Sequence, residues 1–289
     1  MKQLAVWGLV LNAFVWGCSW YPFRALEAQG LHPLWATVAI YALALLALLL
    51  WRPGAWRQLR RHPLLWLLML ASGMTNVGFN WAVTVGDVVR VVLLFYLMPA
   101  WTVLLAWLLL GARPDARALV RLLLALTGVV IVLKTPDSPW PVPGGLADGL
   151  ALVGGFSFAL TNLLLLKLKD TPREARAFGM FAGGMLLALG AGLLGGPLDV
   201  VNTPPAPHGG WVLLALAVSL AFLAANLGLQ YGAARLSAGA TSLILLTEVL
   251  FASLSSVLLG AAELEQRTLF GGALILLAGA WASRDELKR

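Results

Sequence analysis

Long apolar runs separated by short polar breaks dominate the chain. Crossing a bilayer as a helix takes about 20 mostly apolar residues, and ten runs approach or exceed that length. Their approximate ranges are 4–23, 33–51, 64–84, 88–110, 117–133, 146–166, 175–195, 210–232, 236–260 and 267–283. The breaks between them carry Pro, Gly or charged residues. The pattern therefore predicts an all-α membrane protein with ten transmembrane helices.

The composition agrees with a membrane protein and excludes several kinds of site. Hydrophobic residues make up 60% of the chain and charged residues 11%, whereas soluble domains carry about 25% charged residues. A single cysteine, Cys18, excludes an internal disulfide and a Cys-rich metal site. The three histidines adjoin Pro or Gly in predicted loops, so we expect no metal and no cofactor. The bulky Trp16 and the nine following runs favour a retained first helix over a signal peptide.

The basic residues are distributed unevenly around the predicted helices. With the N-terminus inside the cell, sixteen of the 20 Lys and Arg residues fall on the cytoplasmic side and four outside. Cytoplasmic loops collect Lys and Arg, so we expect both termini in the cytoplasm and a multi-pass protein of the cell inner membrane. This distribution also explains the net charge of +7. No nucleic-acid partner is expected, because no basic stretch is separable from the spans.

Three sequence blocks recur in the same order about 150 residues apart. Residues 76–81 match 226–231 with an offset of 150, residues 99–111 match 248–260 with an offset of 149, and residues 126–129 match 277–280 with an offset of 151. Recurrence in order indicates two homologous halves of five helices each. The expected organisation is a first repeat at 1–133, an extracytoplasmic linker at 134–145, a second repeat at 146–283 and a cytoplasmic tail at 284–289.

The number of helices in each half determines their relative orientation. Because five is odd, the second half must enter the membrane from the opposite side, which makes an inverted repeat. Such repeats are typical of transporters that work by alternating access. The sequence therefore predicts a transporter.

Several motifs carry a resemblance to a known family. They are Trp16-Gly17-x-Ser19 in the first helix, the block from Pro99 to Gly111 in the fourth, and its repeat from Glu248 to Gly260 in the ninth. With these motifs the whole chain resembles the drug/metabolite transporter superfamily, in its EamA-type ten-helix branch. Within it, the chain is similar to aromatic amino-acid exporters of the YddG type. It departs from the family pattern at Val249, where a Pro is common.

The resemblance implies a central cavity lined by helices one, three, four, six, eight and nine, with the fifth and tenth helices outside. It also implies export of amino acids, aromatic ones included, or of related small metabolites. Drug efflux and the flipping of lipid-linked carriers remain alternatives on the same scaffold. The expected partners are the small-molecule substrate and membrane lipid, and the protein is expected to be a monomer. Gly17 and Pro99 are predicted hinges.

Four amides are the first candidates for chemistry. Asn76 and Asn80 are four residues apart on one helix face, and Asn226 and Gln230 repeat this spacing in the second half. A buried amide is costly unless it is hydrogen-bonded, so all four should face the bundle interior. They either meet the polar part of a substrate or bond across helices. We assign Asn76 and Asn226 to the structural role, and Asn80 and Gln230 to substrate binding.

Glu248 is the only acidic residue predicted well inside a span, halfway along the ninth helix. An intramembrane carboxyl is a functional candidate by default, and it could carry a proton or pair with a substrate amine. The alternative is a hydrogen-bonded carboxyl that holds helix contacts, with Thr247 or Ser255 as its partner. At the mouth of the fourth helix, a salt bridge is expected between Asp87 and Arg90.

Aromatic and small residues complete the candidate site. Trp16, Tyr96 and Trp101 lie deep on helices predicted to line the cavity, where flat rings suit an aromatic or cationic substrate; packing is the alternative. The full predicted substrate-binding set is Trp16, Ser19, Asn80, Trp81, Tyr96, Trp101, Phe156, Ser157, Gln230, Tyr231 and Glu248. No phosphate loop, metalloprotease motif or intramembrane Asp pair occurs, so an enzyme is not expected.

Overall fold

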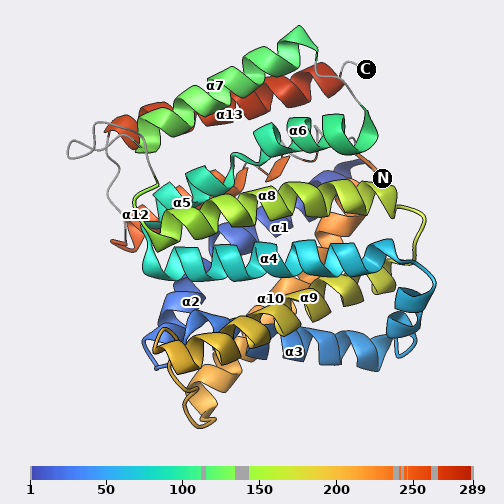
Figure 1. The fold of residues 1–289 in the computed structure, drawn as a ribbon, viewed down its shortest axis with the longest axis vertical. Coiled ribbons are helices and arrows are strands. Elements are labelled where there is room, and N and C mark those ends of the chain that lie inside the picture. Colours follow the sequence, from blue (N-terminus) through green and yellow to red (C-terminus); the bar gives the residue numbers. More distant parts are fainter. Residues whose placement is uncertain are drawn as a thin grey trace.

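The computed structural model describes residues 2–111, 115–133, 143–236, 241, 244–245, 247–261 and 266–287, and all its regular elements in these ranges are helical. The first half contains α1 (Lys2–Gly17), α2 (Trp20–Glu27), α3 (Pro33–Trp51), the short 3-10 helix η1 (Ala55–Arg60), α4 (Leu64–Val85), α5 (Val88–Phe95), α6 (Met98–Leu110) and α7 (Ala116–Leu133). Figure 1 shows most of these helices running side by side as stacked rods.

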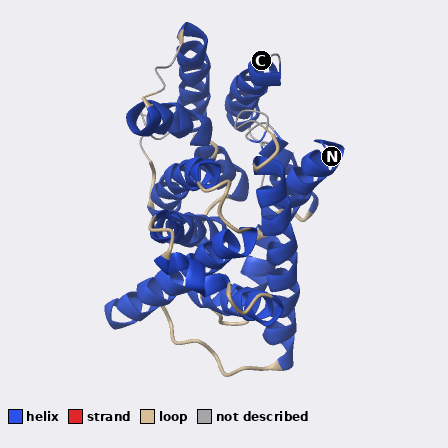
Figure 2. Ribbon diagram, turned by 90° about the vertical axis from the view of Figure 1, so that its right-hand side faces the viewer, coloured by secondary structure: helices blue, strands red, loops and turns tan. Residues whose placement is uncertain are grey.

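The second half repeats this order. It contains α8 (Leu146–Lys167), α9 (Arg173–Gly195), the 3-10 turn η2 (Gly196–Leu198), α10 (Gly209–Ala233), α12 (Thr247–Leu258) and α13 (Gln266–Leu287). Within the described residues, six helical segments are long and apolar enough to cross a membrane: Gln3–Glu27, Pro33–Trp51, Val88–Leu109, Leu146–Lys167, Arg173–Leu198 and Gly209–Ala233. The helical ribbon in Figure 2 contains no strand among the parts it describes.

The two halves are related by an approximate two-fold arrangement. Two helices contact their own counterparts in the other half: α3 packs on α9, and α7 on α13. The remaining contacts come in matched pairs, since α1 packs on α10 as α4 packs on α8. This is the contact pattern of two five-helix repeats that intertwine. The predicted all-α fold built from two repeats is confirmed.

Backbone geometry repeats at the same spacing as the sequence. Helix α6 begins at Met98 and α12 at Thr247, an offset of 149 residues. Both helices are followed by a glycine in the left-handed region, Gly111 with φ +66° and Gly260 with φ +67°. Only a residue without a Cβ adopts this conformation at little cost. The two glycines therefore end equivalent helices by the same device.

Two predicted continuous helices are interrupted, and a proline explains each interruption. The first span divides at Cys18 and Ser19, before Pro22 in α2, and the fourth divides at Tyr96 and Leu97, before Pro99 in α6. Proline has no N–H to donate and its ring displaces the preceding turn, so it is tolerated only near a helix start. The predicted spans 4–23 and 88–110 correspond to the apolar segments Gln3–Glu27 and Val88–Leu109, each divided into two helices.

Glu248 lies in α12, within the predicted ninth span, and is buried. The expected salt bridge between Asp87 and Arg90 is wrong. Arg90 forms its ion pair with Asp148 of α8, at 2.7 Å between Nη2 and Oδ2, instead of with Asp87. The Asp87 carboxylate caps α5 by accepting from the backbone N–H of Arg90 at 2.7 Å. Asp87 lies directly before α5, so its carboxylate accepts from the first turn of that helix as an N-cap.

Polar contacts hold the connections at the end of the bundle where α2 lies. Arg24 of α2 donates from Nη2 to the carbonyl of Gly86 at 2.7 Å, beyond the last turn of α4. His32 caps α3, where its Nδ1 accepts from the N–H of Leu34 at 3.2 Å. Partial burial lowers the pKa of His32, which favours the neutral imidazole that can accept this bond. Both ends of the chain lie at the same end of the bundle as η1 (Figure 1).

Small residues allow several helices to approach backbone to backbone. A Cβ added at Gly183 of α9 would lie 1.9 Å from the carbonyl oxygen of Met69 in α4, and one added at Gly73 would lie 2.5 Å from the carbonyl oxygen of Gly183. Gly8 of α1 and Gly228 of α10 approach each other in the same way. Helices in membranes gain much of their contact energy from such close packing.

We expect Gly183→Ala to destabilise the protein by about 1–3 kcal/mol, because the new methyl group overlaps the backbone of α4 and forces the two helices apart. Gly190→Ala on the same helix is the matched control, since a Cβ there meets nothing within 4 Å. The control should be neutral or more stable by about 0.5–1 kcal/mol, as alanine is the better helix former. Thermal unfolding of the purified protein in detergent measures both, and equal melting temperatures for the two variants would contradict the predicted contact.

Candidate functional site

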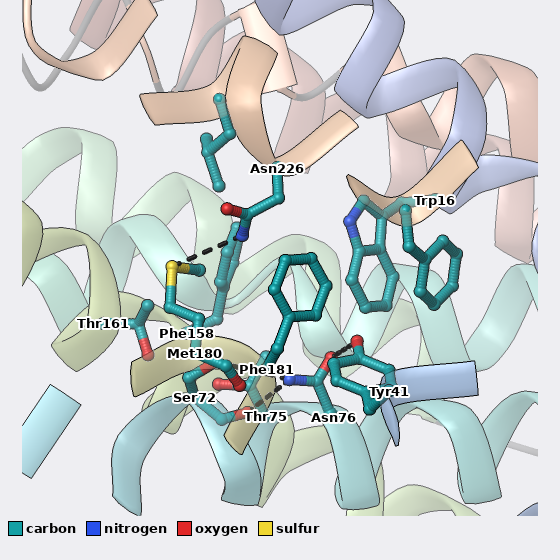
Figure 3. Close-up of a pocket in the computed structure, with 12 residues that line it drawn as sticks. Trp16, Tyr41, Ser72, Thr75, Asn76, Phe158, Thr161, Met180, Phe181 and Asn226 are labelled. Atoms are coloured by element: carbon teal, nitrogen blue, oxygen red, sulfur yellow. Dashed lines mark hydrogen bonds between the residues drawn. The ribbon is translucent and has the colours of Figure 1, made fainter. Parts of the chain in front are cut away.

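A cavity lies between the two halves, near the middle of the bundle (Figure 3). It encloses about 410 Å³ not occupied by protein atoms, counting the part open to solvent. Three helices of the first half, α1, α3 and α4, line it together with their three counterparts α8, α9 and α10. The lining residues are Trp16, Tyr41, Ser72, Thr75, Asn76, Phe158, Thr161, Met180, Phe181, Phe222, Asn226 and Leu229. Helices α5, α6 and α12, from the fourth and ninth spans, do not line this cavity, contrary to the expectation from the resemblance.

Asn76 forms the first polar point of the cavity wall. The hydroxyl of Tyr41 in α3 donates to its Oδ1, and its Nδ2 donates to the backbone carbonyl of Ser72 at 2.6 Å. Both contacts of the amide are drawn in Figure 3. The amide is thus paired on both sides and held rigidly, while one edge of the Asn76–Tyr41 pair faces the cavity.

Asn226, the equivalent of Asn76 in the second half, forms the opposing polar point. Its Nδ2 donates to the sulfur of Met180 at 3.4 Å, and its Oδ1 accepts from Nε2 of Gln230 at 2.7 Å. A thioether is a weak acceptor, so this amide retains donor capacity. The two amides therefore differ. The protein bonds both ends of the Asn76 amide strongly, whereas the Nδ2 of Asn226 is bonded only weakly, which suits a ligand.

Stacked aromatic rings form the apolar wall of the cavity. Trp16 of α1 lies over Phe222 of α10 with ring centroids 4.7 Å apart and planes 21° apart. Tyr41 contacts Phe222 edge to face at 5.9 Å and Phe181 at 5.5 Å. Offset and edge contacts of this kind are favourable for aromatic pairs. A flat apolar group would find further ring faces and edges in this wall.

Several polar atoms at or near the cavity have no hydrogen-bond partner within the described part of the chain. They include Oγ1 of Thr161, which lines the cavity, Oε1 of Gln230, and Nε of Arg176. Native proteins pair most buried polar atoms, so each exception needs an explanation, such as a bound molecule or water. These unpaired atoms are the kind that a polar substrate would satisfy.

Glu248 lies behind this cavity and holds the two halves together. The hydroxyl of Tyr96, at the break between α5 and α6, donates to Oε2 of Glu248 at 2.5 Å and lies 2.8 Å from the carbonyl oxygen of Leu245. Both side chains are buried, with 0% and 3% of their surfaces exposed. Gly17 of α1 lies against the same turn, since a Cβ there would be 2.7 Å from the Glu248 carbonyl oxygen. Thr247 and Ser255, the partners considered from sequence, bond elsewhere.

The structure distributes the other predicted site residues around the cavity. Ser19 is buried in the break between α1 and α2, where its Oγ donates to the carbonyl of Trp16 at 2.7 Å. Nδ2 of Asn80 donates to Oγ1 of Thr37 at 3.0 Å. Trp81 lies edge-on to His32 toward the end of the bundle where α2 and α3 meet.

The remaining members lie on other surfaces. Trp101 of α6 contacts Phe156 of α8 at 5.5 Å between ring centroids, and Phe156 is 38% exposed. Ser157 is buried in α8. Tyr231 lies under the guanidinium of Arg235, 3.6 Å from its ring centroid. Pro99 is in the first turn of α6. Of the predicted binding set, Trp16 alone is among the residues that line the cavity, joined by Asn76 and Asn226.

Sequence reasoning missed the contribution of the second and seventh spans. Tyr41, Met180 and Phe181 come from these helices. Their sequences are almost entirely apolar, so no face could be predicted to line the cavity. One signal was available: Tyr41 is a hydroxyl in the middle of an otherwise apolar run, and a buried tyrosine normally has a hydrogen-bond partner. The helix in which Met180 lies carries many small residues, which marks it as a helix that packs closely.

Comparison with known proteins supports the fold and the class. The sequence matches the EamA-like transporter family over residues 3–134 and 145–284. A curated relative named as an uncharacterized transporter of Pseudomonas aeruginosa is 31% identical over 141 residues. That match covers 46% of this chain and 47% of the relative, so it spans about half the length of each. A protein crystal structure aligns over 100% of this chain and 99% of its own, with a TM-score of 0.64 at 18% identity, which supports the fold.

We expect Tyr96→Phe to lower the free energy of unfolding by about 1–3 kcal/mol, because it leaves the buried Glu248 carboxyl without its donor. Tyr21→Phe is the control, as Tyr21 is 55% exposed. The melting temperatures of both variants in detergent check the expectation. A Tyr96→Phe protein that melts with the control would show that the contact adds nothing to stability.

Proposed function

Because the chain belongs to the EamA-like transporter family, we propose that it exports amino acids, aromatic ones among them, across the inner membrane by alternating access. The proposal includes the placement of both termini in the cytoplasm, which the distribution of basic residues favours. It needs no cofactor and no catalytic group, since the chemistry of the cycle is binding and release.

One observation carries the choice of substrate class. The cavity combines two opposed amides, Asn76 and Asn226, with a wall of stacked rings that includes Trp16 and Phe222. Asn226, whose Nδ2 is bonded only to a thioether, retains donor capacity for a small polar head group, and the rings offer a face to a flat side chain. An aromatic amino acid has this division into a polar head and a flat apolar side chain.

The position of the cavity supports the mechanism. It is bounded by three helices from each half, so exchanging the conformations of the halves would open it toward the other side. The Tyr96–Glu248 contact joins the halves beside the cavity and so responds to any relative movement. A protonatable carboxyl at that point links the movement to proton binding, which makes Glu248 the group we propose for coupling.

Flux in reconstituted vesicles tests the substrate class. Proteoliposomes loaded with unlabelled phenylalanine, tryptophan or leucine should accumulate the same labelled amino acid by exchange, whereas protein-free vesicles should not. Aromatic members should exchange fastest, because the ring wall adds contact area. Flux of cationic drugs without flux of any amino acid would refute the amino-acid proposal while leaving a transporter.

Glu248→Gln tests the coupling. We expect wild-type flux to vary with pH and the variant to lose most of this dependence, because an amide accepts the Tyr96 hydrogen bond but does not titrate. Glu27→Gln is the matched control, on an exposed position of α2. Initial flux rates are measured over a range of pH with equal amounts of folded protein. A Glu248→Gln protein with the wild-type rate and pH profile would eliminate proton coupling at this site.

A further inference from the structure

Arg176 is a buried cation without a hydrogen-bonded or ion-pair partner in the described part of the chain. It lies in α9, 2% of its surface is exposed, and its Nε has no hydrogen-bond acceptor. No ion pair or side-chain hydrogen bond of Arg176 occurs in the residues that the structure describes. Removing a guanidinium from water without pairing it is expensive. A cation kept under these conditions calls for an anion that binds during the working cycle.

Arg176 shares a face of α9 with a residue that lines the cavity. Residues 173, 176 and 180 follow one another at spacings of three and four and so share a helix face. Arg173 lies 5.5 Å from the ring of Tyr231, and the sulfur of Met180 accepts from Asn226, both on α10. Arg176 lies between these two contacts with α10, one turn from the cavity residue Met180. Figure 3 shows Met180 and Asn226 facing each other at the cavity wall.

The α10 residue at the same level is Gln230. It is 1% exposed, its Nε2 donates to Asn226 at 2.7 Å, and its Oε1 has no donor. An unpaired acceptor thus lies on the helix that Arg176 faces, one turn from an amide of the cavity wall. Together the two side chains leave one charged donor and one neutral acceptor unpaired. A carboxylate with an ammonium on the neighbouring carbon would satisfy both.

Acidic residues near Arg176 do not fill this role. Asp170 and Glu174 act on its charge at longer range, and Arg173 opposes them. Asp170 is exposed and Glu174 is partly exposed, so their carboxylates remain hydrated. Neither approaches the guanidinium within the 4 Å of an ion pair.

We propose that Arg176 binds the carboxylate of the transported substrate, at the end of the cavity nearest the start of α9, with Gln230 accepting from its ammonium group. The proposal rests on the proposed function and adds the charge and orientation of the substrate. The head group lies toward Arg176 and the side chain toward the rings of Trp16 and Phe222. Arg176 provides charge-assisted and two-pronged hydrogen bonds that suit a carboxylate.

Matched ligands test the proposal in the wild-type protein. Phenylalanine is compared with phenylalaninamide, which lacks the carboxylate charge, and with phenethylamine, which lacks the carboxyl group. Binding is measured by the ligand-induced shift in melting temperature and transport by exchange in phosphatidylcholine vesicles. We expect the acid to bind about ten- to a hundredfold more tightly than either analogue, the range for a hydrogen bond to a charged group.

Variants then assign the discrimination to Arg176. Arg176→Gln should lose the preference for the acid while binding the amide as the wild type does, and Arg176→Lys should retain part of it. Arg173→Gln, three residues away on the exposed part of α9, is the control and should keep the full preference. Melting temperatures without ligand establish that each protein is folded.

The outcomes separate this inference from the proposed function. Equal binding of acid and amide by the wild type would overturn the carboxylate site while leaving transport intact, and so would an unchanged preference in Arg176→Gln. Competition by phosphatidylglycerol that removes the acid preference would assign Arg176 to a lipid head group and overturn the proposal. No exchange and no shift with any of the compounds would overturn both the inference and the proposed function.

Discussion

The hydrogen bond between Tyr96 and Glu248 is a buried polar contact that joins the two halves of the bundle. It links the break in the fourth span to α12, at positions that the repeat makes nearly equivalent. A carboxyl inside an apolar bundle requires a donor, and the tyrosine hydroxyl at the break before Pro99 supplies it. The same turn receives Gly17 of α1. Three spans therefore meet at one polar point.

The two equivalent amides of the cavity wall have different hydrogen-bond partners. Asn76 is paired by Tyr41 and by its own helix, whereas Asn226 is paired by a thioether and by Gln230. The repeat supplies both amides, but their neighbours differ, so Asn76 is bonded strongly on both sides and the Nδ2 of Asn226 is bonded only to a weak acceptor. The repeat thus provides the scaffold, and the differences between its halves give the two walls of the cavity different polarity.

Much of the fold follows from the sequence, since hydrophobic runs and the offset of about 150 residues reflect requirements that every spanning helix must satisfy. The same reasoning correctly singled out the buried amides and Glu248, because polar groups in hydrocarbon are costly. It did not find the partner of Glu248, as Tyr96 is 152 residues away and its hydroxyl is brought there only by the break before Pro99. It also chose the wrong partner for Arg90, because sequence separation favoured Asp87 over the more distant Asp148. The second and seventh spans were not predicted to line the cavity, because the prediction relied on polar residues and these spans are almost entirely apolar.

The close contact of α4 with α9 is not matched by its equivalent in the other half. It depends on Gly73, and the position equivalent to Gly73 in the second half is Leu223. Helix α10 therefore presents an isobutyl group where α4 presents only a hydrogen atom. Two helix pairs that the repeat makes topologically equivalent thus differ in how closely their backbones can approach, so the two halves share one topology but not one packing.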